Sequence, residues 1–418
     1  MFEGLYRQRL EADLARWESE GVIARAVGVS IRAALPPRPK GVNVATVVAI
    51  VGGLLIAGAF LAFVASNWTA IARPARFAIL LAGIVLAFSL GGFFDQRRRP
   101  HVADLGVAVG SIIFGAAIAL VGQMYHLGDD FAGGLLLWAF GALVAAVLTG
   151  SRGALAVALV VACLWSGASV GGIADVPHLP FVGFWLICAV LSVVWNAPSA
   201  RHLVSLAALV WWTIAGVETI GRRHFGDGVF VVGAGCSLML GGGLLFASVG
   251  RDSLRSLGRV LSIYGAFGLA SVAAATPFCL GASAHLELQF WGIGSAVAGL
   301  ALIGAAAALT RNVATALAGL AIGLALAAIA GASPTDGPWF AYAFALLSML
   351  SLLASGTLDD VRPRIVAGWI GIAFVIAAIT WMVEGSLLRR AAFLAIAGFA
   401  AIGLASVLGR LSRRESGR

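Results

Sequence analysis

The chain has 418 residues, of which 61% are hydrophobic and only 11% are charged, and its mean hydropathy is +0.99. Soluble domains carry roughly 25% charged residues, so an assembly of soluble domains is excluded. A net charge of +9 would indicate nucleic-acid binding in a soluble protein. Here the basic residues stand in short segments between apolar runs, so they indicate orientation in a membrane and we expect no nucleic-acid partner.

Residues 1–40 differ from the rest of the chain because they mix acidic and basic residues and lack the apolar core of a signal peptide. Leu10, Leu14 and Trp17 recur on one helical face, and Gly21 breaks that pattern before a second amphipathic stretch that ends at a group of prolines. The pattern predicts a short cytosolic helical hairpin. It is too small to own a core, so we expect it to contact the membrane surface, the membrane domain or a cytosolic partner.

Residues 41–409 consist of apolar runs separated by charged residues or by proline and glycine turns. A membrane-spanning helix needs about 20 apolar residues. The fold class predicted is therefore all-α: a polytopic integral membrane helix bundle of about 14 transmembrane helices, with 12 as the alternative. The runs lie at 43–66, 74–94, 104–124, 131–149, 153–173, 180–196, 203–220, 229–249, 259–281, 288–309, 313–331, 339–356, 365–383 and 391–408.

The distribution of Lys and Arg predicts the orientation. If the N-terminus is cytoplasmic and the spans alternate, the inner segments hold 22 basic residues and the outer segments hold six. Short cytoplasmic loops carry an excess of Lys and Arg, so we expect both termini in the cytoplasm, with 410–418 as a basic cytosolic tail. The predicted location is the inner membrane of a bacterium, with the lipid bilayer as the first partner.

Two stretches share an order of features: an acidic residue at the outer end of a span, a tryptophan within it, and an arginine in a small inner turn. They are Asp130, Trp138 and Arg152 in the first stretch, and Glu287, Trp291 and Arg311 in the second. This order predicts six-helix repeat units at about 104–249 and 259–408. Convergent membrane composition is the alternative.

The order of features in residues 5–150 resembles a bacterial membrane-protein family known as domain of unknown function 2157. The matching residues are Leu10, Leu14, Trp17, Gly21 and Ile23, then Phe63-Val-Ala-Ser-Asn67-Trp68, Pro74 and Arg76, then Gly122-Gln123-Met-Tyr125-His126 with Asp129, and finally Trp138 and Arg152. The sequence departs from the family at Ala24, where a polar cap is common. The resemblance implies a multi-span inner-membrane protein and carries over no catalytic or binding residue.

Polar residues within spans are costly and often functional. Seven polar or aromatic residues gather at the predicted outer ends of the first and third spans: Asn67, Trp68, Gln123, Tyr125, His126, Asp129 and Asp130. If these ends are adjacent, they form a polar outer cluster, which is a candidate binding site; an interfacial aromatic belt is the alternative. His126 and Asp129 are ligand-like, but no second ligand motif accompanies them, so we expect no metal and no cofactor.

Glu218 is the candidate ionisable residue within the membrane, because it lies near the end of the run 203–220. Arg222 and His224 follow within reach. A helix-end ion pair and a proton or cation site are the two interpretations. The four cysteines lie in apolar runs without metal-ligand spacing, and we interpret them as packing residues.

Three functions fit these observations. The favoured one is a transporter or carrier of a small neutral or lipid-like molecule, since the chain predicts many spans with short loops and few charges at depth. The second is a membrane scaffold or sensor whose residues 1–40 dock a cytosolic partner. The third is an intramembrane enzyme that uses the outer polar cluster. The sequence has no Walker motif and no HExxH, and it predicts no strand that could place a GxSxG serine at a strand-turn-helix junction, so catalysis is the less favoured interpretation.

Overall fold

The computed structural model describes residues 72–125, 130–169, 177–249, 251–279, 289–331 and 339–382, together with 16–34 and scattered positions of the N-terminal segment. These residues are helical and include no strand, which confirms the all-α class. The chain divides into two compact units, Met1–Leu55 and Ile56–Arg418. The division into 1–40, 41–409 and 410–418 stays a prediction.

The first unit contains a helical stretch that ends at Ser19, followed by α2 (Arg25–Ala34). Gly21 lies between them with a φ of +74°, a left-handed conformation that glycine adopts without a steric penalty. The N–H of Val22 donates to the carbonyl of Trp17 at 2.9 Å, which closes the end of the first helical stretch. The break between the two helical stretches therefore lies where the sequence pattern placed it.

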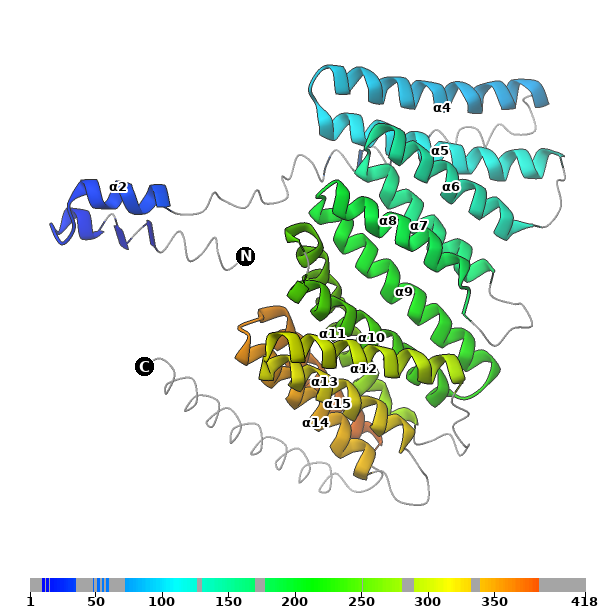
Figure 1. Ribbon diagram of the computed structural model, residues 1–418. Coiled ribbons are helices and arrows are strands. Elements are labelled where there is room, and N and C mark those ends of the chain that lie inside the picture. Colours follow the sequence, from blue (N-terminus) through cyan, green and yellow to red (C-terminus); the bar gives the residue numbers. More distant parts are fainter. Residues whose placement is uncertain are drawn as a thin grey trace. The chain divides into compact units, whose positions relative to one another are not determined.

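The second unit consists of antiparallel helices joined mostly by short turns (Figure 1). Proline stands at the first positions of several of them, where its missing N–H has no helical acceptor in any case. The helices are α4 (Arg73–Gln96), α5 (Pro100–Tyr125), α6 (Phe131–Thr149), α7 (Arg152–Ala168), α8 (Pro180–Val194), α9 (Pro198–Arg222), α10 (Phe225–Val249), α11 (Asp252–Cys279), α12 (Phe290–Thr310), α13 (Val313–Ala330), α14 (Trp339–Leu358) and α15 (Arg362–Met382).

Among the described residues, ten helices are long and apolar enough to cross a membrane, and α7 and α8 are shorter apolar helices of 17 and 15 residues. Twelve of the predicted apolar runs coincide with these helices. The run 43–66 lies almost wholly outside the described residues, and 391–408 lies wholly outside them. The count of 14, the orientation of the termini and the six-helix repeat therefore stay predictions.

The centre of the second unit is α10, which packs against α9, α11, α12 and α13. Its contact with α11 depends on glycine. A Cβ atom on Gly243 would lie 2.6 Å from the backbone nitrogen of Ser262, and one on Gly258 would lie 2.5 Å from the carbonyl oxygen of Gly243. Small residues let helix backbones approach closely in a membrane, so these two glycines determine how closely α10 and α11 pack.

Side-chain hydrogen bonds join interhelical turns, or the helix ends beside them, that lie two helices apart along the chain. The hydroxyl of Ser151 donates to Asp104, the Arg201 guanidinium donates to the Ser256 hydroxyl at 2.7 Å, and the Asn312 amide donates to Asp359 at 2.7 Å. Two intervening helices return the chain to the side it left. The two partners of each hydrogen bond therefore lie at the same end of the helix bundle. Which end of the bundle faces the cytoplasm stays a prediction.

Candidate functional site: an aromatic cavity

A cavity of about 390 Å³ lies between α8, α9, α10, α11 and α12. Aromatic side chains from three of these helices form much of its wall: Phe181, Trp185, Trp211, Trp212 and Trp291. The cavity therefore brings together residues that are more than 100 positions apart in the sequence. This concentration of tryptophan makes it the candidate functional site.

The aromatic rings form a connected series across the cavity wall. Phe181 stacks on Trp211 with ring centroids 5.7 Å apart, Trp211 meets Trp212 edge to face at 5.0 Å, and Trp212 stacks on Trp291 at 6.2 Å. Such offset and edge-to-face pairs stabilise one another beyond simple burial. The indole N–H of Trp185 donates to the carbonyl of Val204 at 2.8 Å, so its polar atom has a partner. The wall is consequently ordered and presents ring faces.

The local sequence explains why there is space here. With 15 residues, α8 is about 22 Å long, whereas the hydrocarbon core of a bilayer is about 30 Å thick. The cavity is lined partly by Pro177 and Leu179, which precede α8. Behind the Trp212 ring lies α10, where a Cβ atom on Gly235 would lie 2.2 Å from that ring. Glycine at this position therefore allows the indole to lie directly against α10.

The cavity reaches the middle of the bundle. Trp211 lies near the centre of α9 and Met239 near the centre of α10, and both line the cavity. Phe181 and Trp291 lie near the beginnings of α8 and α12, at the end of the bundle that the sequence pattern predicts to be the outer one. The space thus extends from that end to the middle of α9 and α10.

The chemistry of the lining is apolar. Among the described residues that line the cavity, none is charged and Ser295 supplies the single hydroxyl group. An ionised ligand would lose its hydration without gaining a partner charge. A neutral or lipid-like molecule suits such a wall, because ligand sites are mostly apolar with few polar groups.

His178 lies beside the cavity, between Pro177 and Leu179 of its lining. Its ring meets that of Trp165 edge to face at 4.5 Å, and its Nδ1 is buried without a hydrogen-bond partner among the described residues. Burial lowers the pKa of His178 below its usual value of 6.5. We therefore expect this imidazole to be neutral at pH 7.

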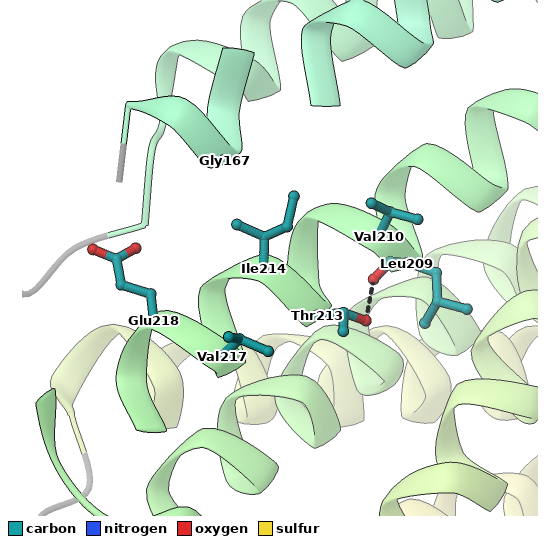
Figure 2. A pocket seen from close by; sticks show the side chains of 7 residues that line it. All are labelled: Gly167, Leu209, Val210, Thr213, Ile214, Val217 and Glu218. Atoms are coloured by element: carbon teal, nitrogen blue, oxygen red, sulfur yellow. Dashed lines mark hydrogen bonds between the residues drawn. The ribbon is translucent and has the colours of Figure 1, made fainter. Parts of the chain in front are cut away.

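Glu218 lies at the end of an apolar groove between α7 and α9 (Figure 2). Its Oε1 lies 2.7 Å from Nη2 of Arg222, one helical turn onward, and its side chain is 14% exposed. Gly167 of α7 and Ile214 of α9 are among the other lining residues. The structure thus contains the helix-end ion pair, and a proton or cation site at Glu218 stays a prediction.

Most of the predicted outer polar cluster lies outside the described residues: Asn67, Trp68, His126, Asp129 and the side chain of Tyr125. Gln123 and Asp130 are described, and both are exposed. The Asp130 carboxylate accepts a hydrogen bond from the Gly133 N–H at 2.7 Å, which caps the N-terminus of α6. Asp130 therefore has a structural role, and a binding site at this cluster stays a prediction.

Asp227 is a buried acid that the sequence pattern did not single out. It stands before the predicted run 229–249, but α10 begins at Phe225, so Asp227 lies in its first turn and is 2% exposed. Its Oδ2 accepts from the His224 N–H at 3.3 Å, whereas its Oδ1 has no partner among the described residues. The available signal was an acidic residue three positions after the helix cap.

The described residues contain no group of three His, Cys, Asp or Glu side chains that could hold a metal ion. Within this part of the chain the four cysteines, Cys163, Cys188, Cys236 and Cys279, are free thiols. Three of them are buried and Cys163 is partly buried. They contribute packing volume to the bundle.

Residues 15–155 match the model of a family described as "Predicted membrane protein (DUF2157)". The resemblance to domain of unknown function 2157 is confirmed. The DUF2157 match begins within the first helical stretch, covers α2 and α4 to α6, and ends at the start of α7. No curated protein and no solved structure matches the chain. The match and the ten apolar helices together make this a membrane protein of the lipid bilayer, and the aromatic cavity lies outside the DUF2157 match.

Proposed function

We propose that this protein is a carrier of a lipid-like or small neutral molecule, and that the aromatic cavity is its binding site. The observation that carries the proposal is the cavity itself: it reaches mid-membrane depth, and its described lining residues include no charge. Carriers place their substrate sites near the bilayer midplane. A wall of ring faces and aliphatic groups favours cargo that needs no counter-charge.

The position of the cavity supports a route for such cargo. The space is bounded by α8, which has 15 residues, whereas its neighbours α9 and α10 have 25 each. A short spanning segment is accommodated by local thinning of the bilayer. A lipid-like molecule therefore has a shorter distance to cross beside α8 than beside the other helices.

The test uses the full-length protein in liposomes that contain a fluorescent nitrobenzoxadiazole-labelled phosphatidylcholine. Dithionite destroys the fluorescence of lipid in the outer leaflet only, so protein-dependent crossing appears as additional loss of signal. We expect such loss with the unaltered protein and at least a several-fold slower loss with Ala208→Trp, which fills the cavity. Leu148→Trp is the matched control, because Leu148 is an exposed residue of α6. If the protein causes no additional loss, the carrier proposal for lipid-like cargo is wrong.

The exposed apolar surface of the first unit favours a second candidate, the scaffold or sensor. Val22, Val27 and Val29 of the first unit are 66%, 47% and 61% exposed, which leaves apolar surface for a cytosolic partner or a membrane surface. Deletion of residues 1–36 distinguishes the two candidates. A carrier keeps its lipid-crossing activity without these residues, whereas a scaffold that acts through them loses its partner.

A further inference from the structure

A second groove, of about 820 Å³, lies at the opposite end of α8 from the aromatic cavity. It is formed where α8 and α10 end and α11 begins. Its apolar wall consists of six side chains: Val193, Val194, Leu245, Phe246, Val249 and Leu254. Val194 and Val249 are 70% and 66% exposed, so the groove opens outward from the bundle and not into its core.

Polar groups occur at one end of this groove. Arg251 and Ser253 line it beside the first turn of α11. Arg251 is exposed and forms no ion pair with any described residue. The neighbouring Asp252 has a fully exposed carboxylate that lies 3.7 Å from the Arg255 guanidinium. The carboxylate closest to Arg251 in sequence thus pairs with Arg255, one turn along the helix. The Arg251 guanidinium remains available to bind another anionic group.

We propose that this groove binds one anionic phospholipid, with an acyl chain along the apolar wall and the phosphate at Arg251. The groove lies between membrane-spanning helices, where lipid chains are the solvent. Arginine at the end of such a helix extends to the headgroup level, since its stem is apolar and its tip is charged. The groove therefore matches both parts of a phospholipid.

The charge distribution of the chain favours an anionic headgroup. The turn that contains Arg251 belongs to the segments that hold 22 of the 28 basic residues and that we assign to the cytoplasmic side. Anionic lipids are enriched in the cytoplasmic leaflet, and each Lys or Arg near that surface contributes about 1 kcal/mol of attraction. This proposal is independent of the carrier proposal, because a lipid bound here remains at its own end of the membrane.

The experiment measures lipid bound to the full-length protein by native mass spectrometry, with phosphatidylglycerol and phosphatidylcholine offered at equal concentration. We expect preferential binding of phosphatidylglycerol, and a fall of about fivefold in that preference for Arg251→Gln, which corresponds to the loss of one basic residue. Arg152→Gln is the matched control, because Arg152 is an exposed arginine at the start of α7, in a turn that we also assign to the cytoplasmic side, and it does not line the groove. Equal effects of the two substitutions, or no preference in the unaltered protein, would overturn the proposal.

A second pair of variants tests the apolar wall separately. Val249→Trp fills the groove, so we expect it to reduce binding of both lipids, whereas Leu148→Trp on α6 should reduce neither. Unchanged binding in Val249→Trp would overturn the placement of the acyl chain. Millimolar inorganic phosphate should not displace the lipid; displacement would show that the site recognises a free anion. Because lipid crossing of liposomes is measured separately, the two proposals fail independently.

Discussion

Two spanning helices of this protein, α4 and α10, have nearly the same length and are both strongly apolar, but they occupy opposite environments. In α4, only 17% of an apolar stretch of 18 residues is buried inside the protein. In α10, 78% of the corresponding stretch is buried. The large side chains Phe77, Leu81 and Leu86 of α4 are about half exposed or more, whereas α10 contacts four other helices. Apolarity places both helices in the bilayer and does not decide which of them is central.

The difference lies in side-chain size. Between Phe225 and Val249 the chain has seven glycines, while α4 has three and many large aliphatic or aromatic residues. Lipid chains are as apolar as leucine, so burial of a large side chain against another helix gains little over burial against lipid. Close backbone approach gains dispersion and excludes lipid, which favours the glycine-rich helix at the centre.

The largest expected effect is the disruption of α10 at its closest contact. Gly243→Leu should destabilise the protein by about 3 kcal/mol, because the added side chain collides with the α11 backbone. Gly242→Leu is the control on the same helix, since no atom lies within 4 Å of a Cβ built there. Thermal unfolding monitored by fluorescence in detergent measures the difference. Equal melting temperatures for the two variants would contradict the glycine-based account of the α10–α11 contact.

A truncation pair sharpens the comparison of the two helices. Leu240 of α10 is fully buried and Leu86 of α4 is 61% exposed. We expect Leu240→Ala to cost about 2 kcal/mol or more, because it leaves a cavity among packed helices. Leu86→Ala should cost less than about 0.5 kcal/mol, since lipid fills the space. A comparable loss of stability in both variants would show that α4 packs as closely as α10 does.

A smaller effect is expected from a polar contact of the central helix. The Ser237 hydroxyl of α10 donates to the carbonyl of Ala296 in α12 at 3.0 Å. Ser237→Ala should cost about 0.5–1 kcal/mol, the usual value for a hydrogen bond between membrane helices. Ser248→Ala, which removes a hydroxyl bonded within its own helix, should cost less. The ordering of the two melting temperatures tests whether the interhelical bond contributes.

The smallest expected effect concerns His178, which lies outside the helices. Because burial lowers its pKa in the folded protein, the unfolded chain takes up the proton first as the pH falls. The stability contributed by neutral His178 is therefore present above pH 6.5 and is lost progressively below it. We expect the melting temperature to fall less between pH 7 and pH 5 in His178→Gln than in the unaltered protein. Identical pH profiles would contradict a partly buried, neutral imidazole.

Much of the local structure follows from the sequence. The glycine at position 21, the apolar runs and the prolines at helix starts predicted the helical break in the first unit and twelve of the helices. Each of these features depends on a few neighbouring residues, so it can be predicted from the local sequence alone. The sequence also indicated the ion pair of Glu218 with Arg222, because four residues form one helical turn.

The candidate site could not be predicted in the same way. Phe181, Trp211 and Trp291 meet in one cavity although 110 residues separate the first from the last. Asp227 lies outside the predicted run 229–249, and α10 includes it only because this helix begins earlier, at Phe225. In each case the outcome depends on which helices pack together, and no periodicity within a single span contains that information.

The sequence by itself determined that this is a membrane protein built from helices, because the lipid environment requires every backbone group to be bonded within its own segment. It also determined the likeness to DUF2157 over residues 15–155. Only the tertiary structure decided that α10 is central, that an aromatic cavity lies beside the short α8, and that Arg251 lies at the end of an apolar groove. The physical reason is that lipid solvates every apolar face equally well, so side-chain size and helix length select the neighbours.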